Sequence, residues 1–329
     1  MTLMRTAPVK VYAKKFQMWL AYRMAEGVLF LFRKSFKALP VGMFRLVTGS
    51  VAGTLISIFL SRRKIIKNLD KVLGETYSPA TKKGLARGVQ WNIGRNAQDC
   101  IFQWLDPRYV FENVTVTGIE NLEAGLAKGK GVIALGAHLG NYVLVGARLG
   151  LEGYRFHTLF RVLSDKRVQD IIDRNVNSFH QNIIPSLPRR AAVTRVLSAL
   201  KNNDIVFILA DNLKKGKIPT SLFGQTVFSP RGPVSLALRS GAVVLPIYLI
   251  RNYQGGLDLI IGQEIPMTRN GSLTADIARN TDRTMVYLED LIRCYPDQWS
   301  WLTVRMRGRK QAITPPSVFR LSARSQPSS

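Results

Sequence analysis

The sequence predicts an α/β fold: a mixed, largely parallel sheet flanked by helices, with N-terminal amphipathic, membrane-associated helices. From residue 113 onward, short apolar runs alternate with segments of helical periodicity, which is typical of a parallel or mixed sheet covered on both faces. The chain of 329 residues is long enough for one large domain of this kind with appended elements. Its N-terminal part is basic and amphipathic.

Two N-terminal segments indicate contact with a membrane. Residues 11–37 have the apolar spacing of an amphipathic helix and carry several lysines and arginines. Residues 46–60 form an apolar stretch with basic flanks, shorter than the ~20 residues that span a bilayer. Core helices or a helix pair in the headgroup region would both fit, and a membrane-spanning anchor is the least favoured interpretation. We assign residues 1–75 to an N-terminal segment of basic, amphipathic helices at the membrane interface.

The remaining chain divides into a domain and a tail. We expect residues 76–311 to form the α/β domain and the Pro- and Ser-rich residues 312–329 to be disordered. Ser78 followed by proline suits the start of a helix. The expected strands are 131–136, 156–160, 204–210, 242–250 and 257–262. The expected helices are 78–104, 139–149, 165–179, 191–202, 234–239 and 276–294.

The charge of the chain restricts its partners. Lysine and arginine number 47 against 21 aspartates and glutamates, for a net charge of +26 and an isoelectric point near 10.6. Nucleic acid, an anionic membrane or an acidic protein would each complement this charge. The chain has no zinc-finger, recognition-helix or RNP-like pattern. Composition leaves nucleic acid and membrane equal, and the amphipathic N-terminus favours the membrane.

The cysteines and histidines indicate neither a disulfide scaffold nor a metal centre. Two cysteines are too few for such a scaffold, and with the three histidines they show no metal-ligand spacing. We therefore expect no metal and no cofactor. A reduced, cytosol-facing setting is the default for such a chain.

One histidine lies where a catalytic base is often found. The apolar run GVIALG, residues 131–136, ends in small residues and leads to His138, and a helix-compatible segment follows. The positive end of a helix disfavours the imidazolium ion, so we expect a neutral ring, the form that acts as a general base. A structural histidine satisfied by hydrogen bonds is the alternative. The glycines and alanine around His138 favour function, because they let a substrate approach.

The order of several motifs is distinctive. Segment HLGNYV, residues 138–143, resembles the H-x4-D/E box of glycerolipid-type acyltransferases, and most closely that of the bacterial lipid A biosynthesis (lauroyl/myristoyl) acyltransferase family. The likeness covers most of the chain. Its other blocks are an RR–NL signature at residues 62–69, LFRVLSD at 159–165, ILADN at 208–212, FGQTVFSPRGP at 223–233 and YPDQWSWLTVRMR at 295–307.

The resemblance implies a reaction and roles for named residues. It implies transfer of a fatty acyl group from an acyl carrier protein or CoA thioester to a hydroxyl of a phosphorylated glycolipid or lysolipid. His138 would deprotonate that hydroxyl, and Arg161 would bind phosphate. Arg231, beside Gly232, is either a second phosphate contact or a loop charge, and without the resemblance Arg161 would equally fit a solvated surface arginine. Asn141 belongs to the conserved pattern of the box and is a further candidate substrate-binding residue.

The chain departs from the family pattern at the acidic position of the box. Val143 stands where an aspartate or glutamate would orient the histidine ring, and Asp211 is followed by asparagine where glutamine is usual. A valine accepts no hydrogen bond from an imidazole N–H. Either another acid reaches His138, with Asp211 and Asp99 as candidates, or the acceptor needs little base catalysis, or the protein no longer transfers acyl groups.

We predict an acyltransferase despite Val143, located peripherally or monotopically at the cytoplasmic face of the bacterial inner membrane. Acyl carrier proteins are acidic and the acceptor lies in an anionic membrane, so the positive charge would steer both toward the protein. A non-catalytic relative that binds lipid or acyl carrier protein is the alternative. A basic nucleic-acid-binding protein is the third class, with only the charge in its favour.

Overall fold

The computed structural model describes residues 60–302, with gaps at 75–76, 107, 164 and 214–215, together with the isolated positions 27 and 34. The expected helix at 11–37, nearly all of the apolar stretch at 46–60 and the tail at 312–329 lie outside the described residues. Among the helices that are described, none is both long and apolar enough to cross a bilayer. The proposed boundaries at residues 75 and 311 stay predictions.

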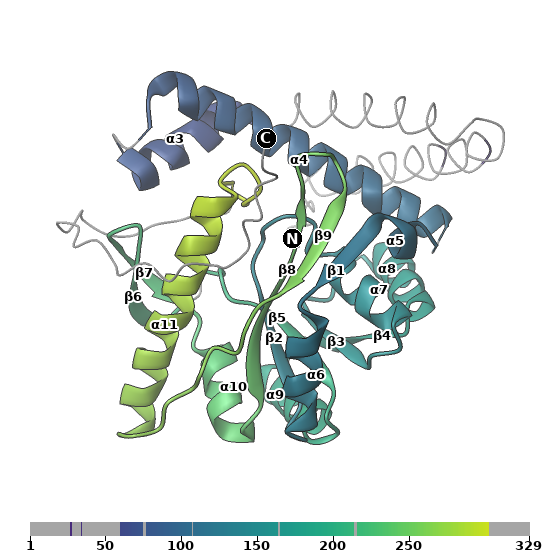
Figure 1. Ribbon diagram of the computed structural model, residues 1–329, viewed down its shortest axis with the longest axis vertical. Coiled ribbons are helices and arrows are strands. Elements are labelled where there is room, and N and C mark those ends of the chain that lie inside the picture. Colours follow the sequence, from purple (N-terminus) through teal and green to yellow (C-terminus); the bar gives the residue numbers. More distant parts are fainter. Residues whose placement is uncertain are drawn as a thin grey trace, which may run out of the picture.

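A seven-stranded sheet with the order β1-β9-β8-β2-β5-β3-β4 forms the centre of the protein (Figure 1). Five neighbouring strands, β8, β2, β5, β3 and β4, are parallel, and β9 with β1 runs in the opposite direction. This confirms the mixed, largely parallel sheet. The strands are β1 Val114–Thr117, β2 Val132–Gly136, β3 Phe156–Phe160, β4 Gln181–Pro185, β5 Ile205–Leu209, β8 Val243–Arg251 and β9 Leu257–Ile261.

Helices cover both faces of the sheet because its strands are apolar on both sides. In β2, Val132 and Ala134 belong to one buried cluster, and Ile133 belongs to another on the opposite face. The first cluster packs against α5 Arg108–Asn113, α6 Ile119–Ala127 and α7 Leu144–Leu151. The second packs against α9 Arg189–Lys201 and α10 Gly232–Ser240. Helix α8 Lys166–Ser178 packs against the edge strand β4.

A third apolar cluster closes the end of the sheet at which the parallel strands finish. It joins α3, α4, α11 and the segment at residues 295–302, and Figure 1 shows α4 crossing that end. In α3, Asn68 donates to the Trp301 backbone carbonyl at 2.6 Å, and Arg62 donates to Gln90 of α4 at 2.8 Å. The elements are α3 Arg62–Leu73, α4 Pro79–Leu105, α11 Leu273–Cys294 and the hairpin β6 Ile218–Leu222 with β7 Gln225–Ser229.

The expected elements agree with the structure except at one important boundary. All five expected strands are present within two residues of their expected ends. The helix expected at 139–149 begins only at Leu144. The preceding residues form bridges instead, Leu139 with Trp299 and Gly140 with Leu249. The expected helix start was wrong because tertiary backbone pairing holds these residues out of the helix. Strands β1 and β4, the β6–β7 hairpin and helices α5 and α6 were not expected.

Candidate active site

His138 and Asp211 meet at the carboxyl end of the sheet. His138 follows β2 by two residues, and Asp211 follows the neighbouring parallel strand β5 by the same distance. Gly136 pairs with Leu209, so the two chains leave the sheet side by side. The His138 ring Nδ1 lies 2.8 Å from Asp211 Oδ1, and the His138 backbone N–H donates to Asp211 Oδ2 at 2.8 Å.

The carboxylate fixes the tautomer of the ring. An ionised carboxylate only accepts hydrogen bonds, so Nδ1 carries the proton and donates it, and the lone pair of His138 lies on Nε2. Asp211 also accepts a hydrogen bond from the indole N–H of Trp299 at 3.0 Å. The Asp211 side chain is only 2% exposed and that of His138 is 30% exposed. The acid is therefore buried beneath a ring that remains open to a substrate.

The pair changes the basicity of the histidine. Burial alone would lower the pKa of His138, but the hydrogen bond to Asp211 and the charge of Asp211 outweigh it, so the pKa lies above its usual value. From the sequence, we expected the positive end of a helix to keep the ring neutral. That expectation was wrong, because α7 begins at Leu144 and a carboxylate lies against the ring instead.

The backbone around His138 is clamped between β8 and the segment at residues 298–300. Gly140 adopts a left-handed φ of 58°, and a Cβ there would lie 1.9 Å from the Leu249 carbonyl oxygen, so only glycine fits. The Gly140 N–H donates to the Gln298 carbonyl at 3.0 Å, and the Ser300 N–H donates to the His138 carbonyl at 2.9 Å. These bonds hold the His138 loop against a rigid strand.

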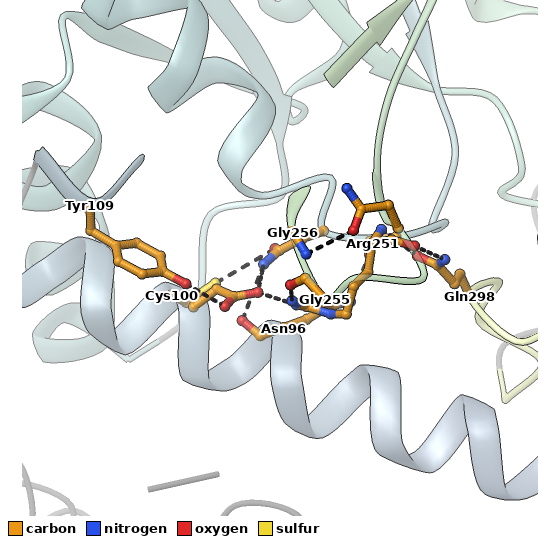
Figure 2. A network of polar contacts seen from close by, with 11 residues as sticks. Asn96, Cys100, Tyr109, Arg251, Gly255, Gly256 and Gln298 are labelled. Atoms are coloured by element: carbon orange, nitrogen blue, oxygen red, sulfur yellow. Dashed lines mark hydrogen bonds and ion pairs between the residues drawn. The ribbon is translucent and has the colours of Figure 1, made fainter. Parts of the chain in front are cut away.

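A buried polar network extends from this loop to α4 (Figure 2). Asp99, the second candidate acid, forms an ion pair with Arg251 and accepts a hydrogen bond from the Tyr109 hydroxyl at 2.8 Å. Asp99 also accepts from the Asn141 amide at 3.2 Å, and the same amide donates to the Asn96 carbonyl at 3.3 Å. Asp99 is therefore bonded to residues other than His138, and Asp211 is the candidate acid that contacts the ring.

The network also reaches the closing segment of the described chain. The Gln298 side chain accepts from the Arg251 backbone N–H at 2.9 Å and donates to the Arg251 carbonyl at 2.8 Å. Arg251 additionally donates to the Gly255 carbonyl at 3.2 Å (Figure 2). Gln298 thereby connects the end of β8 with the loop that carries His138.

A cavity of about 380 Å³ has His138 in its wall. Apolar side chains form much of its wall, and His138 and residues of its loop also line it. The apolar residues include Leu60, Val89, Ile93 and Leu302.

Cys100 also borders the cavity. Burial, followed by the charge of Asp99, raises the pKa of the Cys100 thiol to about 12. This thiol is not a nucleophile at neutral pH, because too little thiolate is present.

Val143, at the family's acidic position, precedes the first residue of α7 and is 51% exposed. Val143 lines the same cavity as His138. Nδ1 of the His138 ring is already bonded to Asp211. The side chain of Tyr142 lies edge-on to the ring, with centroids 5.2 Å apart. The acid that contacts the histidine therefore comes from a neighbouring strand end, 73 residues further along the chain.

The structure places the other candidate residues near the carboxyl end of the sheet, where His138 lies, but not in contact with His138. Arg161 directly follows β3, and Arg231 directly precedes Gly232, the first residue of α10. Both arginine side chains are exposed. Asn141 is 2% exposed and lines the cavity, and its amide is held by Asp99. A substrate contact through that amide would have to replace one of these bonds.

Sequence reasoning assigned no role to Trp299 and Gln298. Both lie in the YPDQWSW segment, which contributed to the family resemblance. Trp299 bonds the candidate acid, and Gln298 anchors the loop of the candidate base. The motif was a usable signal, but only the tertiary structure shows that this distant segment packs against His138.

The chain is similar in sequence to known bacterial proteins. A sequence profile described as bacterial lipid A biosynthesis acyltransferase matches residues 13–308. A phosphatidylinositol mannoside acyltransferase of Mycobacterium tuberculosis (strain ATCC 25618 / H37Rv) is 29% identical over 136 residues, 40% of this chain and 43% of that protein. A protein of the same name from Mycolicibacterium smegmatis is 24% identical over 194 residues, 58% of this chain and 62% of that protein. Each match spans less than two thirds of the relative's length.

Proposed function

The chain belongs to the bacterial lipid A biosynthesis acyltransferase family, and we propose that it is an acyltransferase of lipid biosynthesis whose catalytic base is His138. The acyl group moves from a thioester to a hydroxyl of a phosphorylated glycolipid or lysolipid. The acceptor named for the two mycobacterial relatives, phosphatidylinositol mannoside, is a phosphorylated glycolipid. The observation that carries the proposal is the His138–Asp211 pair at the cavity.

The chemistry follows from the tautomer of His138. Nε2 accepts the proton of the acceptor hydroxyl as its oxygen attacks the carbonyl carbon of the thioester. The C–S bond breaks, and the imidazolium returns the proton to the leaving sulfur, so the products are an ester and a thiol. Asp211 orients the ring through Nδ1 and stabilises the imidazolium formed during the attack. In this scheme Asp211 replaces the acid that is absent at Val143.

The acceptor is held by arginine. Arg161 extends from the end of β3, two strand spacings from β2, which is about 10 Å. A guanidinium at that place binds a phosphate of the acceptor while a nearby hydroxyl reaches His138. Arg231, with the backbone of Gly232 at the start of α10, supplies a second phosphate contact.

The donor enters from the cavity side. Its apolar wall accommodates part of the acyl chain, with the thioester carbonyl beside the His138 ring. Acyl carrier protein or CoA carries that chain, and the net charge of +26 attracts either of these anionic donors. The same charge favours association with an anionic membrane, and we place the protein peripherally at the cytoplasmic face of the bacterial inner membrane.

The test is a reconstituted acyl-transfer assay with the full-length protein. Radiolabelled palmitoyl-CoA and palmitoyl-acyl carrier protein are supplied separately with either a lysophospholipid or a mannosylated phosphatidylinositol acceptor. Formation of labelled ester in at least one combination is expected. A lower kcat/KM in Arg161→Lys, with an increased KM for the acceptor, supports the phosphate role. Absence of transfer in every combination, by protein that is folded and vesicle-bound, would contradict the proposal and favour the non-catalytic lipid-binding alternative.

A further inference from the structure

Three large apolar side chains are exposed where two neighbouring strands end. Val162 and Leu163 follow β3 and are 44% and 40% exposed, and Leu187 follows β4 and is 58% exposed. Phe160 pairs with Pro185 at the last position of the two strands, and the Ser186 N–H donates to the Phe160 carbonyl at 2.8 Å. The two segments therefore leave the sheet together. We call Val162, Leu163 and Leu187 the β3/β4 tip.

The tip is placed by the fold and has basic neighbours. The Leu163 backbone N–H donates to the Gln169 side chain of α8 at 2.9 Å, which fixes the segment after β3. Lys166 begins α8, and Arg189 and Arg190 begin α9; all three are exposed. From residue 186 to residue 201 the chain contains no aspartate or glutamate. Asp165 directly precedes Lys166, so the cations beside the exposed apolar side chains gather mainly at the start of α9.

The tip lies at the same end of the sheet as the candidate active site. Strands β2, β5, β3 and β4 are parallel neighbours, so His138, Asp211 and the tip all follow carboxyl ends of strands. From the spacing of strands, β3 and β4 lie about 10 and 15 Å from β2. A surface contacting the tip would therefore also lie near His138.

We propose that the β3/β4 tip inserts into the headgroup region of an anionic bilayer, with Lys166, Arg189 and Arg190 binding the lipid phosphates. An apolar centre with a basic margin is the arrangement that combines burial of apolar area with attraction to anionic lipid. This contact is separate from any made by the N-terminal segment. It rests on the proposed function for its purpose, which is to bring His138 to a lipid acceptor that stays in the membrane.

A bilayer fits the tip better than an acidic acyl carrier protein. The lipid acceptor has to reach His138 from the membrane, so this end of the sheet must face the bilayer during each turnover. The apolar residues lie on segments that extend past the strand ends, where shallow insertion requires no groove. An acyl carrier protein would bind the same basic residues, and the experiment below distinguishes between a bilayer and an acyl carrier protein.

The test places a polarity-sensitive fluorophore at the tip of the full-length protein. In a Cys294→Ser background, Leu187→Cys is labelled with NBD, and Leu273→Cys is the matched control. Leu273 is 54% exposed, close to Leu187, but begins α11 after the antiparallel strand β9, at the opposite end of the sheet. Burial raises the pKa of Cys100 to about 12, which slows its labelling, and the Cys294→Ser protein without a new cysteine gives the remaining background.

Vesicles of phosphatidylglycerol and phosphatidylcholine should shift NBD emission at position 187 to shorter wavelength, and lipids brominated on the acyl chain should quench it. Position 273 should show neither effect. Equal signals at both positions, while the protein sediments with the vesicles, would overturn the proposal. A response at position 187 to acyl carrier protein but not to vesicles would overturn it in favour of a protein-docking surface. Neither readout depends on acyl transfer, so a failed proposed function remains distinguishable.

The cations are tested on the same vesicles by their effect on partitioning. Arg189→Gln and Arg190→Gln should each weaken binding about fivefold, since one basic residue near an anionic surface contributes that factor. The matched control is Lys201→Gln at the far end of α9, a helix of 13 residues and hence about 20 Å long, well beyond the ~8 Å screening length of physiological salt. Equal losses in all three variants would contradict a localised contact.

Discussion

Asp211 binds His138 twice, once through the ring Nδ1 and once through the backbone N–H, each at 2.8 Å. The same carboxylate oxygen that accepts the backbone N–H accepts the Trp299 indole N–H at 3.0 Å. Three donors from two segments thus fix one buried acid. Because the acid cannot turn away from the ring without breaking the other two bonds, the tautomer and the direction of the imidazole are set before a substrate arrives.

Asp211→Asn tests whether this acid works through the ring. The amide keeps the size of the side chain but removes the charge, and its NH₂ group can stabilise the wrong tautomer of His138. In a Ser-His-Asp triad the same change lowers turnover about 10⁴-fold, so we expect a loss of about 10²–10⁴ in kcat with little change in KM. Steady-state acyl transfer measures it. A kcat within threefold of the wild-type value would assign Asp211 a structural role only.

The pH dependence of acyl transfer should report the raised pKa of His138. The base works when unprotonated, so kcat/KM is high above this pKa and falls as the pH drops through it, with a midpoint above the usual value for histidine. In Asp211→Asn, the hydrogen bond to a charged partner is lost and burial remains, so the midpoint should move to lower pH. A midpoint that moves upward, or does not move, would contradict the assignment.

Val143→Glu restores an acid at the family's usual position and should gain little. Ring Nδ1 is already bonded to Asp211, so the new carboxylate is redundant. Val143 is 51% exposed, so a carboxylate at this position stays in contact with water and costs little stability. We expect kcat within threefold of wild type and an unchanged free energy of unfolding. Val143→Gln controls for size without charge. A gain of tenfold or more in Glu but not Gln would show that the natural site lacks an effective acid.

The buried Asp99–Arg251 ion pair supports the loop of His138 and should matter for stability. Arg251→Met leaves Asp99 buried without its cation, which typically costs about 3–5 kcal/mol. Adding Asp99→Asn removes the stranded charge and should recover part of that loss. Urea unfolding followed by circular dichroism measures both. A loss below about 1 kcal/mol in Arg251→Met would show that the pair has little influence on the fold.

Several strands were predictable because their sequences are continuous and apolar. The run at residues 243–250 is buried at every position in β8, as expected for a central strand covered on both faces. β1 was missed because it is short and alternates apolar and polar residues, as in VTVT at 114–117. β4 was missed because its sequence, QNIIP, has only two apolar residues in a row between polar residues and a proline. Their assignment depends on the neighbours with which they pair, and a single sequence does not contain that information.

The candidate site was predictable in its parts but not in its connections. His138 and Asp211 both follow apolar strands, and this suggested that both lie at the carboxyl end of the sheet. Their contact, however, depends on β2 and β5 being adjacent. Asp99 was also a candidate from the sequence, and only the position of α4 shows that it faces Arg251. With valine at position 143, the HLGNYV box contains no acid to orient the histidine ring. Spacing along the chain cannot show that such an acid comes from another strand.

Single-turnover acyl transfer by the His138→Ala variant is the sharpest test of His138 as the base of an acyltransferase. The matched control is His157→Ala, which removes the other histidine bonded to a buried aspartate, with Nε2 2.9 Å from Asp204 at the opposite end of the sheet. Rates are normalised to folded, vesicle-bound protein. We predict a loss of at least about 10²-fold for His138→Ala and a near wild-type rate for His157→Ala. Transfer at the wild-type rate by His138→Ala would show that His138 is not the base.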